Sequence, residues 1–222
     1  MFEAVIFDWD GTLADTRDAV VMSFQKTLEQ IGCRVSDEFI ELRIGIGAKN
    51  TFKEALKKAH APFNDSILEK LVEKKSQWQI NLSENVKLFE GAVNLLDCLH
   101  GKVKIALASM NNKKVIRNLV VEKDVKKYFN VIMTVEDIKH PKPDPEIFLK
   151  SSTNLGCPPK KCVVVEDSIF GVEVARKAGM KCIAVSTGAY SKQELKEADS
   201  DLIVNSINEK QKILSFVFQK HT

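Results

Sequence analysis

The sequence predicts an α/β fold in which an all-helical insert follows the first strand of a parallel sheet. Short apolar runs alternate with helical patterns beyond residue 100, an order that is typical of parallel sheets. Residues 17–87 break that order, because they contain helical patterns and no convincing strand. The six runs that we expect to be strands are Ala4–Phe7, Lys104–Ala108, Val131–Val135, Cys162–Val165, Cys182–Val185 and Leu202–Val204.

The helical insert is predicted from apolar stripes at helical spacing. We therefore expect residues 16–87 to form a separate helical domain, and residues 1–15 with 88–222 to form the core. The stripes are Val20, Phe24, Leu28 and Ile31, which end at Gly32; Phe52, Ala55, Leu56 and Ala59; and Ile67, Leu68, Leu71, Val72 and Trp78, which follow a capping pair of Ser66 and Glu69.

Two helices of the core are predicted from their end signals. One extends from Ser168 to Ala178 and is closed by Gly179, because glycine readily adopts the left-handed conformation that ends a helix. Another begins at Ser191, where Glu194 completes a capping box.

Composition narrows the class of protein. The 222 residues are 44% hydrophobic, which is enough for a substantial core, and 33 basic against 30 acidic residues give a formal net charge of +3. So mild a charge argues against nucleic acid or an anionic membrane as a partner. No apolar run approaches a membrane span of about 20 residues, and the N-terminus lacks the features of a signal peptide. We expect a cytoplasmic protein with reduced cysteines. The composition does not indicate how many copies of the chain associate.

Polar residues follow several of the predicted strands where each strand ends. Asp8 and Asp10 follow the first, Ser109 the second, and Glu166 with Asp167 the fourth, while Lys142 lies in the loop after the third. Ligands of open parallel sheets bind at the carboxyl ends of the strands. Each residue also has a structural interpretation, as a helix cap or a loop residue, but their convergence on one edge favours a functional site.

The residue types suit a phosphate ester bound with Mg²⁺. Magnesium prefers oxygen ligands, usually one or two carboxylates with substrate phosphate, and Asp8 and Asp167 supply such carboxylates. Ser109 and Lys142 are suited to hold phosphoryl oxygens. A carboxylate can attack phosphorus to form an acyl phosphate, so we expect Asp8 to be the nucleophile and Asp10 the general acid and base.

These motifs resemble those of the haloacid dehalogenase superfamily. The matching stretches are FDWDGTLADT at the N-terminus, LAS at 107–109, KPDP at 142–145 and VVVEDSIFGVEVARKAGM at 163–180. The helical insert after the first motif is similar to that of the subgroup with phosphoglycolate phosphatase and β-phosphoglucomutase. The resemblance covers nearly the whole chain and implies a Rossmann-like core with a helical cap domain.

The resemblance also implies roles for individual residues. Asp8 would form an aspartyl phosphate, and Asp10 would give magnesium its backbone carbonyl as well as acting as acid and base. Asp167 would be a metal ligand, with Glu166 as ligand or near neighbour. The backbone N–H groups of Trp9 and Met110 would help to bind the phosphoryl group.

The stretch IGIGAKN at 44–50 is, by the same resemblance, a cap loop that faces the active site. Arg43, Lys49 and Asn50 are then expected as substrate contacts, with ordinary helix connection as the alternative. A dinucleotide site is disfavoured, because Asn50 stands where a third glycine belongs and no strand leads into the stretch.

Two activities share all of these residues. The first is a phosphatase for a small phosphorylated metabolite such as phosphoglycolate or a sugar phosphate; the second is a sugar phosphomutase. Thr12 favours the phosphatase by association, since mutases of this group usually resemble DGV at that position. The second acid, Asp10, disfavours dehalogenation, because a leaving halide needs no proton. A phosphoacceptor signalling module is a third and much weaker alternative, since such modules are roughly half this length.

Overall fold

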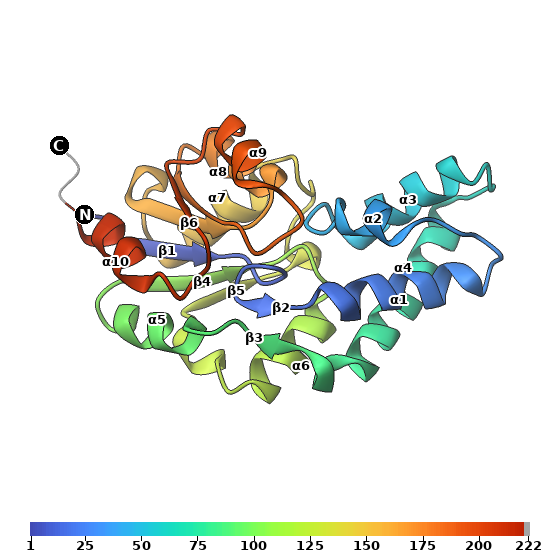
Figure 1. Cartoon of the computed structure of the whole chain (residues 1–222), viewed down its shortest axis with the longest axis horizontal. Coiled ribbons are helices and arrows are strands. Elements are labelled where there is room, and N and C mark those ends of the chain that lie inside the picture. The colour runs from blue at the N-terminus through green and yellow to red at the C-terminus, as the bar shows by residue number, and fades with distance from the viewer. Residues whose placement is uncertain (220–222) are drawn as a thin grey trace.

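The computed structural model describes residues 1–219, in which a central sheet forms one part and a helical insert projects from it (Figure 1). The sheet has the strand order β5-β4-β1-β6-β7-β8, and every neighbouring pair is parallel. The α/β prediction is therefore confirmed. The six strands are β1 (Ala4–Phe7), β4 (Lys104–Ala108), β5 (Val131–Met133), β6 (Cys162–Glu166), β7 (Lys181–Val185) and β8 (Leu202–Val204).

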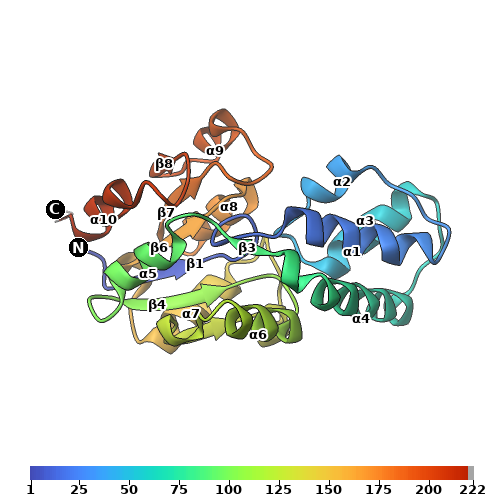
Figure 2. The same ribbon diagram turned by 60° about the horizontal axis from the view of Figure 1, so that its bottom comes forward.

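Helices cover both faces of this sheet, as Figure 2 shows from a second direction. One face packs against α5 (Ala92–Leu99), α6 (Lys113–Glu122) and α10 (Lys210–Phe218). The other packs against α7 (Glu146–Leu155), α8 (Ile169–Lys177) and α9 (Lys192–Glu197). Alternate residues of each strand enter the two cores, which is why β1 and residues 162–165 of β6 are apolar. Short 3₁₀ turns lie at Ser83–Asn85, Lys126–Tyr128, Val135–Asp137 and Pro159–Lys161.

The chain adds strands first on one side of β1, as β4 and β5, and then on the other side, as β6, β7 and β8. From β1 the sheet runs to β4 on one side and to β6 on the other. Helices that leave on opposite faces diverge at such a point and leave a crevice beyond the strand ends. The strand order therefore directs a binding site to the carboxyl end of β1.

The helical insert, at the right of Figure 1, contains α1 (Arg17–Glu29), α2 (Asp37–Glu41), α3 (Ala48–Lys58) and α4 (Asp65–Asn81). Its buried residues form a hydrophobic cluster of their own, which includes Phe24, Leu28, Ile40, Phe52 and Leu71. The short helix α2 was not predicted. A two-stranded antiparallel ribbon, β2 (Ala14–Asp15) with β3 (Lys87–Leu88), joins the insert to the core.

Several details of the predicted helices were wrong. Asn64, and not Ser66, caps α4, since its Oδ1 accepts a hydrogen bond of 2.9 Å from the N–H of Ile67. Ile31 and Ile67 are exposed and do not belong to the buried stripes. In contrast, the capping box of Ser191 and Glu194 is present as predicted.

The state of the cysteines and the character of the helices can both be compared with the sequence predictions. Its five cysteines are free thiols. Within residues 1–219, no helix has the combination of length and apolar character that crossing a bilayer requires.

Candidate active site

Asp8 lies at the carboxyl end of β1 and is almost completely buried, at 3% exposure. Its backbone N–H donates to the carbonyl of Val165, which extends the β1–β6 pairing by one residue. The Nζ of Lys142 lies 3.4 Å from Asp8 Oδ1. The structure thus brings these two predicted site residues together although they are 134 positions apart.

Lys142 also forms an ion pair with Glu166, which lies at the end of β6. The other carboxylate oxygen of Glu166 accepts from the N–H of Asp167 at 2.9 Å, and from the N–H and hydroxyl of Ser168. Both oxygens of Glu166 are thus engaged within the protein. Gly171 leaves the room for this carboxylate, since a Cβ there would lie 1.8 Å from Glu166 Cδ.

Asp167 contacts the loop that follows β1. Its Oδ1 accepts a hydrogen bond of 3.1 Å from the hydroxyl of Thr12. Two glycines approach the carboxylate closely: a Cβ on Gly11 would lie 2.2 Å from Oδ2, and one on Gly188 would lie 1.9 Å from it. Glycine at these positions lets two loops enclose the Asp167 side chain, and at Gly11 it also accommodates a φ of +79°.

Asp10 receives donors from two segments, the residue that precedes α1 and the loop that follows β4. The hydroxyl of Thr16, which precedes α1, donates to Oδ1 at 2.8 Å. Ser109, just beyond β4, donates to Oδ2 at 3.3 Å, and Asn111 Nδ2 lies at the same distance from that oxygen. Ser109 in turn accepts the N–H of Asn111. These contacts fix the orientation of the Asp10 carboxylate toward β4.

The centre has more buried acids than buried bases. Asp8, Asp10, Glu166 and Asp167 are all buried, whereas the only buried lysines within residues 1–219 are Lys75 and Lys142. Burial, followed by the negative charge of Glu166, raises the pKa of Asp8 well above its usual range; Lys142 opposes this only in part. The pKa of Asp167 is raised by burial, Glu166 and Asp8. An enclosed excess of oxygen ligands of this kind fits a divalent cation.

The same buried negative charges stabilise the charged form of Lys142. Burial alone would lower the pKa of its ammonium group, but Glu166 and Asp8 together raise the pKa above the usual lysine value. Lys142 therefore stays charged throughout the neutral range. A permanent positive charge beside Asp8 is suited to a phosphoryl group.

A second buried lysine, Lys75, comes from α4 of the insert and was not predicted. Its Nζ donates to Gln79 Oε1 and lies 3.4 Å from Asn111 Oδ1. It also lies 5.1 Å from the centre of the Phe24 ring. Burial lowers the pKa of Lys75 to about 8, against the attraction of Asp10. Lys75 thus places a titratable group of the insert beside Asn111, the core residue that contacts Asp10.

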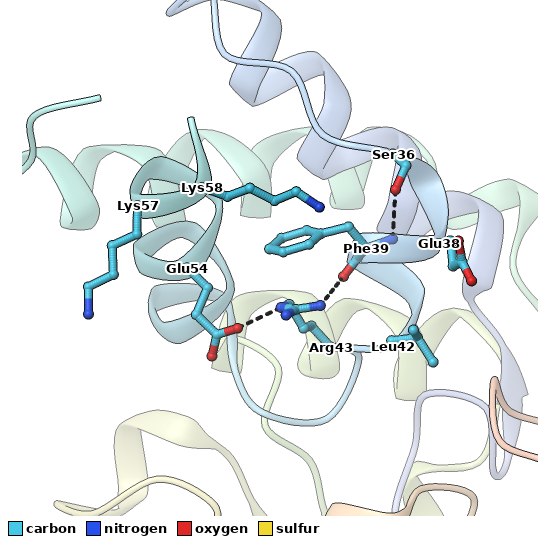
Figure 3. A pocket seen from close by; sticks show the side chains of 8 residues that line it. All are labelled: Ser36, Glu38, Phe39, Leu42, Arg43, Glu54, Lys57 and Lys58. Carbon is cyan, nitrogen blue, oxygen red and sulfur yellow. Dashed lines mark hydrogen bonds and ion pairs between the residues drawn. The ribbon is translucent and has the colours of Figure 1, made fainter. Parts of the chain in front are cut away.

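The three predicted insert contacts lie in different surroundings. Arg43 packs its guanidinium 3.6 Å from the centre of the Phe39 ring, donates to Glu54 at 2.7 Å and to the Phe39 carbonyl, and borders a pocket on α2 and α3 (Figure 3). Lys49 pairs with Asp65 at 2.9 Å. Asn50 donates to the carbonyl of Ile46. All three border cavities between insert and core, but their polar groups already have partners within the insert.

Sequence reasoning missed Thr16, Asn111 and Lys75. Thr16 is the last residue of the N-terminal motif and Asn111 follows the LAS motif by two residues, so their positions were available as a signal although neither was given a role. Lys75 offered none, because lysines are common on exposed helix faces and nothing local distinguishes a buried one.

Comparison with known proteins agrees with this geometry. The family model of the haloacid dehalogenase-like hydrolases matches residues 5–185. The phosphorylated carbohydrates phosphatase of Thermotoga maritima is 33% identical over 187 residues, which are 82% of this chain and 83% of that protein.

Two solved structures are similar over almost their whole length. A hydrolase from Pseudomonas syringae has a TM-score of 0.88 at 25% identity, over 97% of this chain and 99% of that chain. The β-phosphoglucomutase of Clostridium difficile has a TM-score of 0.85 at 26% identity, over 98% of this chain and 99% of that chain.

Proposed function

The chain belongs to the haloacid dehalogenase-like hydrolase family and is a phosphoric monoester hydrolase, and from this premise we propose a magnesium-dependent phosphatase that acts through an aspartyl phosphate. Its substrate is a small phosphorylated metabolite, for which phosphoglycolate and sugar phosphates are the first candidates to test. One observation carries the proposal: the buried carboxylate of Asp8 lies against the Lys142 ammonium, beside Asp10 and Ser109.

In the first half-reaction, a carboxylate oxygen of Asp8 attacks phosphorus and the bond from phosphorus to the alcohol oxygen breaks. Asp10, in its protonated form, gives its proton to the departing oxygen. Lys142 and Ser109 hold the phosphoryl oxygens, with the backbone N–H of Met110, and stabilise the charge that spreads over them.

In the second half-reaction, Asp10 takes a proton from water, which attacks phosphorus and releases phosphate. Asp8 then regains its carboxylate. Thr16 and Asn111 orient the Asp10 carboxylate for both transfers through their hydrogen bonds.

The carboxylates of Asp8 and Asp167, with the backbone carbonyl of Asp10, would hold magnesium, and Glu166 is a further candidate ligand. When bound, the ion supplies positive charge that offsets the repulsion between the phosphate and the attacking carboxylate. The engagement of both Glu166 oxygens favours a role in which Glu166 orients Lys142.

We also propose that residues 16–87 form a cap domain that closes over the site. Two contacts support closure in the present arrangement: a Cβ on Gly45 would touch Ser168, and one on Gly47 would lie 3.2 Å from Met110 Cε. The catalytic acids are buried beneath these contacts, so exchange of substrate and product requires the insert to move.

The proposal is tested by phosphate release from a panel of phosphate monoesters, with and without magnesium. We expect turnover that EDTA abolishes and Asp8→Asn eliminates. The exposed Asp18 provides a matched control, and Asp18→Asn should retain full activity. Turnover that survives Asp8→Asn would contradict the assignment of the nucleophile.

Similarity to a β-phosphoglucomutase supports one alternative, in which a sugar hydroxyl replaces water in the second half-reaction. Product analysis with β-glucose 1-phosphate and a bisphosphate activator separates the two activities. Free phosphate supports the phosphatase, and glucose 6-phosphate supports the mutase.

A further inference from the structure

Two large cavities lie between the insert and the core, and Ile46 and Asn50 border both of them. The first, which we call the α4-side cavity, has a volume of about 580 Å³ and lies between α3, α4 and the core loops that follow β4 and β5. The second, the α8-side cavity, has a volume of about 790 Å³ and includes Lys53, Phe170 and Tyr190. Either is large enough for a small organic ligand.

The position of the general acid decides which cavity receives the alcohol part of the substrate. The departing oxygen must lie within hydrogen-bond reach of Asp10. Asp10 borders a small cavity of about 30 Å³, which shares Gly47, Ala48, Met110 and Asn111 with the α4-side cavity. The α8-side cavity shares only Arg43 with it and reaches the site through Lys142 instead.

The pocket of Figure 3 does not compete for this role. It is bordered by residues 36–58 of the insert alone. None of the catalytic acids borders it, so a ligand bound there would not contact Asp10.

The walls of the α4-side cavity are largely apolar. Most of the lining area is apolar, with contributions from Ile46, Val72, Ile80, Met110, Val135 and Ile138, while polar side chains such as Asn50, Ser76, Gln77 and Asn112 also border the cavity. A sugar could form hydrogen bonds with the polar side chains, but its other hydroxyl groups would face the apolar side chains and gain no hydrogen bond from them. An apolar ligand surface would instead be removed from water, at about 25 cal/mol per Å².

The rim of the same cavity carries charges of both signs. Lys114 and Lys139 both border it, and neither has an ion-pair partner among residues 1–219. Exposed glutamates also border it, with Glu69 and Glu73 on the insert side and Glu136 on the core side. A ligand with an apolar body and polar groups at its outer end would match this distribution.

We propose that the substrate is the phosphate monoester of a ring-bearing alcohol, whose apolar ring occupies the α4-side cavity. This inference rests on the proposed phosphatase function and narrows its substrate class. A two-carbon ester such as phosphoglycolate would reach Asp8 but would leave most of the apolar wall in contact with water. Binding energy from the ring can lower the barrier when it holds the phosphoryl group in line with Asp8.

The test compares kcat/KM for pyridoxal 5′-phosphate, as the ring-bearing ester, with kcat/KM for 2-phosphoglycolate. The wild-type protein should prefer the ring-bearing ester at least tenfold. Glu73 is an exposed residue of α4 that borders the cavity, so Glu73→Trp should fill the cavity without disturbing the insert. This variant should lower kcat/KM for the ring-bearing ester at least tenfold and change that for 2-phosphoglycolate less than threefold.

Lys53→Trp is the matched control, because Lys53 is an exposed residue of α3 that borders the α8-side cavity. It should leave the ratio of the two substrates unchanged. A second variant, Val72→Thr, keeps the shape of the wall but adds a hydroxyl, and should lower kcat/KM for the ring-bearing ester two- to fivefold.

The possible failures are distinct. Absence of phosphate release from every ester would contradict the phosphatase function, and the inference with it. Turnover with a preference for 2-phosphoglycolate, or a substrate ratio that responds to Lys53→Trp and not to Glu73→Trp, would overturn the inference and leave the phosphatase intact.

Discussion

The hydroxyl of Tyr190, in the loop after β7, donates a hydrogen bond of 2.7 Å to the backbone carbonyl of Leu42 at the end of α2. This bond links the core to the insert. Burial, followed by the nearby Asp167, raises the pKa of Tyr190 to about 12, so the phenol remains a donor throughout the neutral range. The Tyr190 ring is held separately by an edge-on contact with Phe170.

Tyr190→Phe should weaken closure of the insert while the ring contact persists. Loss of one hydrogen bond costs about 0.5–1.5 kcal/mol, which corresponds to a roughly two- to tenfold shift toward the open arrangement. Hydrogen exchange at residues 42–47 should become faster by that factor. Tyr128→Phe is the control, since it removes a hydrogen bond to Asp97 within the core. If hydrogen exchange at residues 42–47 became equally faster in both variants, the Tyr190–Leu42 bond would have no specific role in closure.

Lys75 should make stability depend on pH. Its pKa is lowered from 10.5 to about 8 by burial, so between these values the unfolded chain binds a proton that the folded protein lacks. The free energy of unfolding therefore rises with pH in this window, by up to about 1.4 kcal/mol per pH unit. Lys75→Met should be more stable than the wild type at pH 7, and the difference should narrow by pH 10.

Urea unfolding at both pH values measures this effect. Lys70→Met, at an exposed position of the same helix, should show a constant difference from the wild type. If the difference in free energy of unfolding between Lys75→Met and the wild type were equally independent of pH, Lys75 would be charged and solvated in the folded protein.

Asp167→Asn should stabilise the protein in the absence of divalent cations. Burial and the neighbouring acids raise the pKa values of Asp8 and Asp167, so the folded protein holds protons that the unfolded chain has released. Stability without metal is then lost as the pH rises through these raised values. The amide removes one buried negative charge and still accepts from Thr12.

Thermal unfolding in EDTA and in magnesium checks this prediction at pH 5 and pH 8. Magnesium should raise the melting temperature of the wild type more at pH 8 than at pH 5, because the ligands must be deprotonated. Asp167→Asn should lose most of this rise, whereas Asp18→Asn should keep it. An undiminished rise in Asp167→Asn would place the metal elsewhere.

Asp10→Asn should retain magnesium binding, since the backbone carbonyl remains, but slow both half-reactions by about 10²–10⁴. An aryl phosphate with a good leaving group needs no proton for departure. With p-nitrophenyl phosphate, the variant should therefore give a burst of nitrophenol, followed by slow hydrolysis of trapped aspartyl phosphate. Steady turnover at the wild-type rate would exclude Asp10 as acid and base.

The strands and the motif residues could be predicted because their signals are local. The limits of β1, β4 and β8 match the predicted runs, since residues buried on both faces must be apolar in succession. The short elements could not: β2 and β3 have two residues each, too few for any periodic pattern. The cap of α4 was misplaced because Asn64 and Ser66 are both good capping residues and only the fold selects one.

By itself, the sequence determined which residues could do chemistry, because parallel strands bring whatever follows their carboxyl ends to one edge. Only the tertiary structure decided how those residues contact one another: which donors occupy both oxygens of Glu166, which glycines let loops enclose Asp167, and which lysine of the insert lies near Asn111. These contacts join positions as far apart as Thr12 and Asp167. The distances between these residues depend on how the insert and both helical layers pack around β1. This packing joins distant segments, so the sequence next to each residue does not indicate it.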